Sequence, residues 1–350
     1  MKQGSRKFTA IDLFSGCGGL TKGLKNAGFA VLGAVEIDAL SAETYRHNHR
    51  NTRIWETDIR LLNPLQLRRD LGLKRGELDL LAGCPPCQGF STIRTRNGAK
   101  QNRDLRNTLV HEMLRFIRSF HPKTVMMENV PGLKTRSSFR DLCRGLRELG
   151  YMVSWQIKDA ANYGVPQRRK RLILLAGRRF QIPFAAVLGK RRTVRDTIAR
   201  LARAGSSGDL LHDMAEHRTR KILRLIKDIP KDGGSRLDLP KSRQLACHER
   251  CNGFKDIYGR MAWDDVAPTI TGGCFNPSKG RFLHPKENRA ITMREAALLQ
   301  SFPKTYWFPL SASKQAIALM IGNALPPKFI RRHAFEIARA LKNRIAITTK

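Results

Sequence analysis

Acidic residues are scarce in this chain of 350 residues, where 29 Asp and Glu stand against 65 Lys and Arg. The formal net charge of +36 predicts binding to phosphate polymers, so nucleic acid is the first partner to consider. An anionic membrane surface is the rival partner, but the sequence lacks the run of about 20 apolar residues that a membrane-spanning helix requires. We therefore expect a protein without membrane association.

Cysteine is also infrequent, with seven residues. The number is odd, and the cysteines lack the spacing of a disulfide framework. Free thiols in a reducing compartment are therefore expected. The first residues are polar and basic and lead directly into a strand-like segment, so we expect no signal peptide and a cytoplasmic location. A hydrophobic fraction of 41% is enough for a sizeable core, and the length predicts about two domains.

Short apolar runs alternate with helix-like stretches in the first half of the chain, a pattern typical of a parallel sheet covered by helices. The predicted strands are Phe8–Phe14, Ala30–Val35, Leu78–Ala82, Thr124–Glu128, Val153–Ile157 and Leu172–Ala176. Apolar residues have helical spacing in Leu20–Ala27, Asp104–Phe120 and Ser138–Leu149, and again in Thr292–Gln300, Ser313–Ile321 and Lys328–Leu341.

The alternation is lost between about residues 180 and 288, where basic residues mix with Gly, Ser, Pro and scattered aromatic residues. The basic clusters comprise Lys190, Arg191, Arg192 and Arg195, and then Arg218, Arg220, Lys221 and Arg224. We interpret this region as a smaller, strongly basic domain. The predicted division is a larger domain of residues 1–180 and 304–350 and a smaller domain of residues 181–303.

The first motif, Phe14-Ser15-Gly16-Cys17-Gly18-Gly19-Leu20, follows the first predicted strand and opens a helix. Glycines there let the backbone approach a ligand closely, and the helix N-terminus offers unpaired N–H groups. Glu36 ends the next strand, 20 residues after Gly16, where an acid can bind both hydroxyls of a ribose. The full Gly-x-Gly-x-x-Gly pattern is absent, so a mononucleoside such as S-adenosylmethionine fits better than a dinucleotide. A tight turn with a solvated acid is the alternative.

The second motif, Gly83-Cys84-Pro85-Pro86-Cys87-Gln88-Gly89-Phe90-Ser91, follows the predicted strand Leu78–Ala82. Zinc would need a second pair of ligands, and the only other cluster is Cys247-His248-x-x-Cys251. A thioredoxin-like redox site would need the motif to open a helix, whereas two prolines make it a stiff extended loop. A stiff loop at the carboxyl end of a strand can direct a thiolate at a substrate. Buried, inert thiols are the alternative.

Together with later motifs, these two resemble the C5-cytosine DNA methyltransferase family, in the family's order and across nearly the whole chain. Pro86-Cys87-Gln88 is similar to the nucleophile loop, which makes Cys87 the candidate nucleophile, whereas Cys84 stands where the family usually carries glycine. The later matches are Glu128-Asn129-Val130, the Gln-x-Arg-x-Arg run Gln167–Arg171, the segment Arg289–Pro303 that flanks the recognition region, and Gly322-Asn323-Ala324-Leu325.

The resemblance implies S-adenosylmethionine as the methyl donor and a cytosine as the acceptor. Cys87 would add to C6 of the base and so turn C5 into an enamine carbon that can attack a sulfonium methyl group. Glu128 would share a proton at N3 and bind the exocyclic amine, while Arg171 and Arg169 would hold O2 and nearby phosphates, so that preplaced groups match the charge that develops on the ring. A base inside a stacked duplex is out of reach, so it must be flipped out.

The resemblance also assigns a cofactor pocket, and it implies no metal. Phe14 would stack on adenine, Glu36 would hold the ribose, and Asp58 would bind the adenine amino group. The implied cofactor residues are Phe14, Gly16, Cys17, Gly19, Glu36, Ile37, Asp58, Ile59, Leu109 and Asn323. Core packing is the alternative for Leu109, and a surface position is the alternative for Asp58.

The expected fold is an α/β sheet of the S-adenosylmethionine-dependent, Rossmann-like methyltransferase type, with helices on both faces, plus a smaller basic target-recognition domain. The expected function is methylation of cytosine C5 in a specific sequence of double-stranded DNA. We expect a monomer of the kind found in bacterial or phage restriction-modification systems. A cognate restriction endonuclease acting on the same site is the expected partner, with a solitary regulatory enzyme as the alternative.

Three competing hypotheses are a tRNA cytosine methyltransferase, a catalytically inactive DNA-binding protein and a Rossmann oxidoreductase. Gly89-Phe90-Ser91 resembles the DNA branch of the family rather than the tRNA branch. Intact Cys87, Glu128 and Arg171 argue against an inactive protein. An oxidoreductase would explain the glycine-rich turn but neither Pro86-Cys87-Gln88 nor the run Gln167–Arg171.

Overall fold

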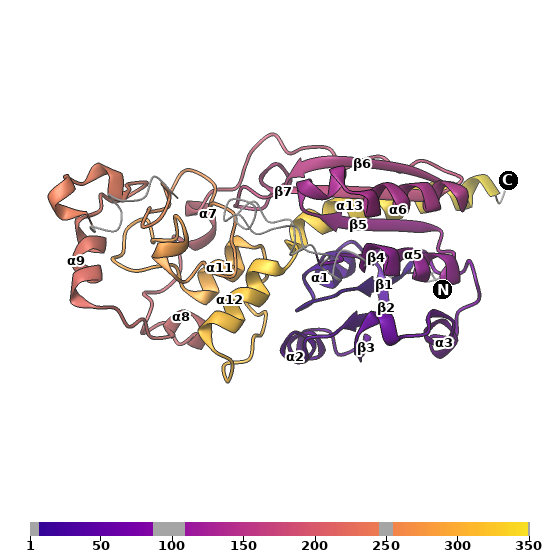
Figure 1. Ribbon diagram of the computed structural model, residues 1–350, viewed down its shortest axis with the longest axis horizontal. Helices are drawn as coiled ribbons and strands as arrows, with labels where there is room; N and C mark the ends of the chain where they lie inside the picture. The colour runs from indigo at the N-terminus through magenta and orange to yellow at the C-terminus, as the bar shows by residue number, and fades with distance from the viewer. Residues whose placement is uncertain (1–6, 87–108, 245–254, 349–350) are drawn as a thin grey trace, which may run out of the picture. The chain divides into compact units, whose positions relative to one another are not determined.

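The computed structural model describes residues 7–86, 109–244 and 255–348 (Figure 1). The chain divides into two compact units. Unit 1 comprises Met1–Asp159, Lys170–Val187 and Pro327–Lys350, and unit 2 comprises Ala160–Arg169 and Leu188–Pro326. Compared with the division at residues 180 and 303 expected from composition, unit 2 takes in a short earlier segment and continues 23 residues further, from residue 304 to Pro326.

Unit 1 is built on a sheet with the strand order β3-β2-β1-β4-β5-β7-β6 among the described residues (Figure 1). Its strands are β1 (Thr9–Leu13), β2 (Ala30–Glu36), β3 (Arg53–Glu56), β4 (Leu80–Gly83), β5 (Thr124–Asn129), β6 (Tyr151–Asp159) and β7 (Lys170–Arg178). The inner strands β1, β4 and β5 are almost completely buried, which explains why they appear in the sequence as continuous apolar runs rather than as alternating patterns.

The expected parallel sheet is confirmed except at one strand, which makes the sheet mixed. β1 pairs in parallel with β2 and β4, and β4 with β5, but β7 runs antiparallel to both of its neighbours, β5 and β6. Only Ala160–Arg169 separates β6 from β7. A parallel crossover needs a dozen or more residues, usually with a helix, so this connection is too short for one.

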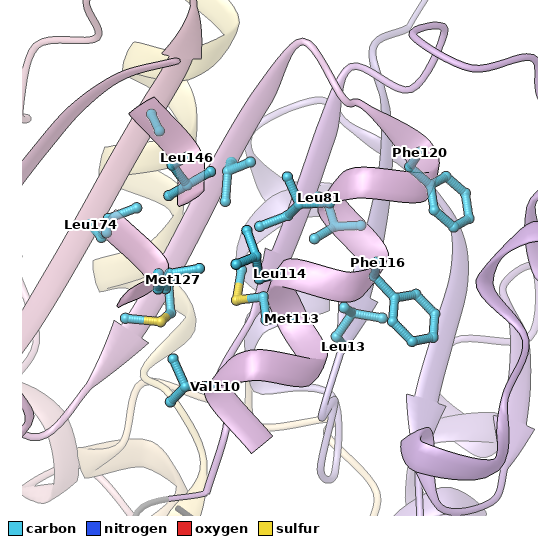
Figure 2. Close-up of a cluster of buried hydrophobic side chains, with 14 of the residues drawn as sticks. Leu13, Leu81, Val110, Met113, Leu114, Phe116, Phe120, Met127, Leu146 and Leu174 are labelled. Carbon is cyan, nitrogen blue, oxygen red and sulfur yellow. The ribbon is translucent and has the colours of Figure 1, made fainter. Parts of the chain in front are cut away.

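Helices flank the sheet on both faces because successive side chains of a strand point to opposite sides. In β1, Leu13 joins a core cluster with Met113 and Phe116 (Figure 2). The neighbouring Asp12 accepts a hydrogen bond from Thr21. The helices of unit 1 are α1 (Gly19–Asn26), α2 (Ala39–Asn48), α3 (Pro64–Asp70), α5 (Leu109–Phe120), α6 (Ser137–Glu148) and α13 (Pro327–Thr348), with 3₁₀ turns η1 (Ile59–Leu61) and η4 (Pro131–Thr135).

Two of these helices show how the sequence determines packing. In α5, Val110, Met113, Leu114 and Ile117 repeat at helical spacing and form one buried stripe, which packs against the sheet (Figure 2). α1 packs against α13 through Gly23, because a Cβ at this position would lie 2.5 Å from Cβ of Ile330. A side chain at Gly23 would therefore push the two helices apart.

Unit 2 consists of short helices joined by long loops, and the structure describes isolated bridges but no strand in its described residues. Its elements are η5 (Ala160–Tyr163), α7 (Arg195–Ile198), α8 (Leu210–Asp213), α9 (Arg220–Asp228), η6 (Arg236–Asp238), η7 (Lys241–Arg243), η8 (Pro277–Lys279), α11 (Met293–Leu299) and α12 (Lys314–Asn323). A core of its own packs Leu225, Ile226, Ile229 and Leu283 under α9. In the described part of the whole chain, no helix has both the length and the apolar character needed to cross a membrane.

Candidate active site

The glycine-rich motif forms the turn between β1 and α1, at the carboxyl edge of the parallel strands. Phe14, Gly16 and Gly18 all have positive φ, at 60°, 53° and 93°. Glycine takes this conformation at little cost, whereas Phe14 takes it at the cost of backbone strain. No atom lies within 4 Å of the position that a Cβ on Gly16 would occupy, so this side of the turn is open. In open α/β sheets, ligands bind at this edge.

Glu36 holds this turn from the end of the neighbouring strand β2. Its Oε2 accepts the N–H of Gly16 at 2.7 Å, and its Oε1 accepts the N–H groups of Ile37 at 3.0 Å and Asp38 at 2.9 Å. Burial raises the pKa of Glu36, although the three backbone bonds oppose this shift. A carboxylate has about four acceptor positions, so one is left for a ligand hydroxyl next to the turn.

Asp58 and Ile59 lie where β3 leads into η1. The Asp58 carboxylate accepts the N–H of Arg60 at 2.9 Å and the Nε of the same residue at 3.0 Å, and this partner lowers the pKa of Asp58. Ile59 is buried, whereas Ile37, after β2, is 64% exposed. The structure thus presents one exposed apolar side chain beside Glu36 and pairs Asp58 with a neighbouring arginine.

The other residues expected at the cofactor pocket are more dispersed. Gly19 begins α1, and the Cys17 thiol is buried, which raises its pKa to about 12, so Cys17 stays a neutral thiol. Leu109 begins α5 and packs against the main core. Asn323 is an exposed residue at the end of α12 in unit 2.

Glu128 and Arg171 form an ion pair on two adjacent strands. Nε of Arg171 lies 2.8 Å from Oε1 of Glu128, and the two side chains are only 14% and 8% exposed. The antiparallel register explains this contact, because Glu128 of β5 pairs with Ile173 of β7, and Arg171 lies two residues along on the same face. An ion pair with so little exposure loses much of its hydration, and such pairs are common at functional sites.

The cysteine loop begins beside this ion pair. Nδ2 of Asn129 donates to the carbonyl of Pro85 at 2.9 Å, which ties the loop to the end of β5. Burial, together with the carboxylates of Glu128 and Asp12, raises the pKa of the Cys84 thiol well above its ordinary value. Cys84 is therefore protonated at neutral pH. Cys87 lies outside the described residues.

Arg169 and Gln167 lie in unit 2, where they connect backbone segments. The Arg169 guanidinium donates to the carbonyls of Ile270 and Gly322 at 3.0 Å each and of Ala324 at 3.2 Å. Gln167 accepts the N–H of Ile270 at 3.0 Å and donates to the carbonyl of Leu299 at 3.0 Å. Both side chains are buried, so this half of the Gln-x-Arg-x-Arg run contacts backbone, whereas Arg171 contacts Glu128.

Two features at this edge were missed by the sequence reasoning. Asn129 belongs to the matched motif Glu128-Asn129-Val130, but only its bond to Pro85 shows what it does. Asp12 is fully buried, its Oδ2 accepts the hydroxyl of Thr21 at 2.6 Å, and that hydroxyl lies 2.8 Å from the Tyr45 hydroxyl. Burial raises the pKa of Asp12 to about 7. In the sequence, an acidic residue within the apolar run of a predicted strand is the signal that could have identified Asp12.

The residues of unit 1 fit an adenosine-bearing cofactor beside a nucleobase site. Gly16 leaves open space, Glu36 offers an acceptor for a ribose hydroxyl, and Ile37 offers an exposed apolar contact. Glu128 and Arg171 offer an acceptor and donors for the polar edge of a base. Both sets lie at the same edge of one sheet, where β1, β2 and β5 end and β7 begins.

Comparisons with known proteins agree with this arrangement. The family model "C-5 cytosine-specific DNA methylase" matches residues 8–339. The chain is 38% identical to the Type II methylase M.HgiDII of Herpetosiphon aurantiacus, over 95% of each chain. It is 32% identical to the Type II methyltransferase M.XorII of Xanthomonas oryzae pv. oryzae, over 95% of this chain and 85% of that one.

Solved structures show the same architecture. A protein described as a DNA modification methyltransferase encoded within an E. coli prophage superposes with a TM-score of 0.68 at 25% identity, over 96% of this chain and 99% of that chain. S. pombe Dnmt2 methyltransferase shares the fold, with a TM-score of 0.61 at 18% identity, over 97% and 99% of the two chains. The chain therefore belongs to the C-5 cytosine-specific DNA methylase family, whose members transfer a methyl group from S-adenosylmethionine to C5 of cytosine in DNA.

Proposed function

We propose that Cys87 is the nucleophile of this DNA (cytosine-5)-methyltransferase and that Glu128 and Arg171 bind the target cytosine. The observation that carries this proposal is the buried Glu128–Arg171 ion pair beside the loop that leads to Cys87. The other cysteine of that loop, Cys84, is half-buried, and its raised pKa keeps it protonated, so it is a poor nucleophile. Asn129 fixes the start of the loop through Pro85 and is a positioning residue.

The proposed reaction begins when the Cys87 thiolate adds to C6 of a cytosine flipped out of the duplex. Glu128 holds a proton at N3 and accepts from the exocyclic amine, while Arg171 donates to O2, so the electron pair pushed into the ring becomes available at C5. S-adenosylmethionine supplies an electrophilic methyl group when bound. The C5 proton then leaves to a base, the bond from sulfur to C6 breaks, and the Cys87 thiolate is regenerated.

Bisulfite sequencing of DNA from cells that express the protein tests this activity and gives the target sequence. Protected cytosines should share one short sequence, and the Cys87→Ser variant should protect none of them. Random or absent protection with the wild-type enzyme would contradict a sequence-specific methyltransferase.

We place the cofactor over the glycine turn, with its ribose on Glu36 and its adenine beside Phe14, Ile37 and Ile59. Asp58 would bind the adenine amino group, which would require its carboxylate to share or release Arg60. Gly16, Cys17, Gly19 and Leu109 complete the proposed pocket in unit 1, and the family resemblance adds Asn323 to the proposed cofactor residues.

We expect Glu36→Gln to weaken S-adenosylmethionine binding by about 1–3 kcal/mol, which is roughly 5- to 150-fold in Kd, because the amide replaces an acceptor with a donor. Because Glu36 must be ionised to accept fully and burial raises its pKa, affinity should fall as the pH is lowered through that raised pKa. Calorimetry measures both effects. Glu56→Gln is the matched control, since Glu56 pairs with Glu36 in the β2–β3 register but binds Arg46 instead. Equal binding by a folded Glu36→Gln variant would remove Glu36 from the site.

We propose that unit 2 recognises the target DNA and that α9 contacts the phosphate backbone. Arg220, Lys221, Arg224 and Lys227 of α9 are exposed, while Leu225 and Ile226 are buried beneath them. The helix is held firmly, because the fully buried Arg260 donates to the carbonyls of Ile226 at 2.6 Å and Ile229 at 3.2 Å. A fixed helix with an exposed cationic face suits a polyanionic duplex.

DNA binding should therefore depend steeply on salt. With about six phosphate contacts, affinity should fall on the order of a thousandfold between 50 and 200 mM salt. Arg220→Gln/Arg224→Gln should reduce the slope of log K against log salt by about 1.8, because each lost phosphate contact contributes about 0.9. Arg331→Gln/Arg332→Gln, on α13, removes the same charge elsewhere and should leave the slope unchanged. Equal slopes for both variants would exclude α9 from the DNA interface.

We also propose that the enzyme is a monomer and that it protects DNA against a restriction endonuclease of the same specificity. The second of these proposals is supported by relatives that cover most of the chain and are named as Type II methylases. DNA modified by this protein should resist the endonuclease whose site contains the methylated cytosine. Full cleavage of such DNA would contradict the restriction-modification role.

A further inference from the structure

Three arginines gather at the amino edge of the sheet in unit 1, opposite the candidate active site, and we refer to Arg75, Arg178 and Arg179 as the far-edge arginines. The N–H of Arg178, at the end of β7, donates to the carbonyl of Lys123 at 2.9 Å, just before β5 begins. The Arg178 guanidinium lies over Gly76, where Nη1 is 3.2 Å from the position of a Cβ. Arg179 follows directly and is exposed, as is Arg75.

Backbone contacts, not carboxylates, hold the Arg178 side chain and the main chain of Arg179 in place. Nη1 of Arg178 donates to the carbonyl of His121 at 3.0 Å, and the N–H of Arg179 donates to the carbonyl of Gly150 at 3.0 Å. None of the three arginines forms an ion pair with a carboxylate in the described part of the chain. The acids nearby have other partners, since Asp79 binds Lys123 at 2.7 Å and Glu77 accepts the N–H of Lys74 at 2.7 Å.

The positive charges of the far-edge arginines are therefore not paired with the nearby carboxylates, which bind Lys123 and Lys74. Burial and the positive charges of Arg344, Arg179 and Arg75 lower the pKa of Arg178. Burial and the positive charges of all three far-edge arginines lower the pKa of His121. Mutual repulsion of this kind is relieved when an anion binds, and guanidinium groups match phosphate oxygens in geometry.

The far-edge arginines and the candidate active site lie at opposite edges of the sheet, so a straight duplex that lies across the carboxyl edge does not reach the far-edge arginines. Arg171 and Arg178 are seven residues apart on one strand, which corresponds to about 23 Å at roughly 3.3 Å per residue. The proposed base-binding pair lies at one end of this strand and the far-edge arginines at the other. A short duplex is stiff, with a persistence length of about 150 base pairs, so it cannot cheaply wrap around the sheet to reach both ends.

We propose that the far-edge arginines bind the backbone phosphates of a second DNA segment, distinct from the one that carries the target cytosine. The inference relies on DNA being the substrate but not on the assigned catalytic residues. A second contact would let the enzyme pass directly from one segment to another while it searches for its target. The sequence-independent character of phosphate contacts suits such a transfer.

Direct transfer has a kinetic signature that can be measured with a fluorescent duplex of 12 A·T pairs, which contains no cytosine. The apparent dissociation rate of this duplex from the wild-type enzyme should rise with the concentration of unlabelled competitor duplex. For Arg75→Gln/Arg179→Gln, we expect that dependence to fall at least about fivefold. Both residues are exposed, so the variant should fold normally. Arg331→Gln/Arg332→Gln removes the same charge and should behave as wild type, because Arg332 lies about 18 Å along α13 from Arg344, at 1.5 Å per residue.

Stoichiometry gives a second readout. Sedimentation should find two short duplexes per wild-type chain at low salt and one per Arg75→Gln/Arg179→Gln chain. A dissociation rate independent of competitor, or one that rises equally in the variant, would overturn the proposal. So would a single duplex per chain combined with tight binding of inorganic pyrophosphate, since the site would then be for a small anion. Methyl incorporation is measured separately, and its loss in every protein with transfer intact would count against the catalytic assignment only.

Discussion

Cys87→Ser is expected to lose methyl transfer by on the order of 10⁴-fold or more while it still binds S-adenosylmethionine and DNA. A serine hydroxyl is almost entirely protonated near neutral pH, so it cannot add to C6 as a thiolate does. The proposed cofactor residues around the glycine turn and the cationic face of α9 are unchanged in this variant. Tritium transfer to DNA measures the first effect, and calorimetry with cofactor measures the second.

A target DNA with fluorine at cytosine C5 tests the covalent step itself. Methyl transfer to such a base still occurs, but fluorine cannot leave as a cation, so the adduct between Cys87 and C6 should persist. Wild type and Cys84→Gly should both give a denaturation-resistant protein–DNA band, and Cys87→Ser should give none. A band that survives in Cys87→Ser and disappears in Cys84→Gly would identify Cys84 as the nucleophile.

The structure gives a reason to expect the first of these outcomes. Cys84 lies directly after β4, and burial together with two neighbouring carboxylates keeps its proton on at neutral pH. Replacement by glycine removes this thiol together with its hydrogen bond to the backbone of Glu128. Cys84 is thus tolerated beside Glu128 because it is not a thiolate.

Local pattern was sufficient to predict most strands of unit 1. Leu78–Ala82 and Thr124–Glu128 were expected as strands, and β4 and β5 cover these segments within one or two residues at each end. The direction of β7 was not accessible in this way, because periodicity shows that a segment is a strand but not which way it runs. The length of the preceding connection was the usable signal.

Motif order likewise predicts only part of the candidate site. Motif order was enough to group Glu128 with Arg171, and the β5–β7 register brings them into contact. Motif order also grouped Arg169 with them, yet its guanidinium binds carbonyls of unit 2. Alternation along a strand would place Arg169 and Arg171 on the same face, because they are two residues apart. Arg169, however, precedes β7, so only the three-dimensional structure shows which arginine of the run reaches Glu128.

The second large effect is expected at Glu128. Glu128→Gln keeps the size of the side chain but removes its charge, so it can neither hold a proton at N3 nor balance Arg171. We expect the rate of methyl transfer to fall by about 10²- to 10³-fold, comparable to the loss of one preorganised group at a site of developing charge. The Kd for S-adenosylmethionine should be unchanged, because Glu36 and the glycine turn are separate from this pair. Single-turnover kinetics with saturating DNA measures the chemical step.

The ion pair also requires a control for stability, because removal of one partner of a buried pair leaves the other charge uncompensated, at a cost of about 3–5 kcal/mol. The double variant Glu128→Gln/Arg171→Gln removes both charges and should recover part of the unfolding free energy that Glu128→Gln loses. It should not recover methyl transfer, because the base would then lack both its acceptor and its charged donor. A double variant that regains activity along with stability would mean that the pair supports the fold of β5 and β7 and does not act on the cytosine.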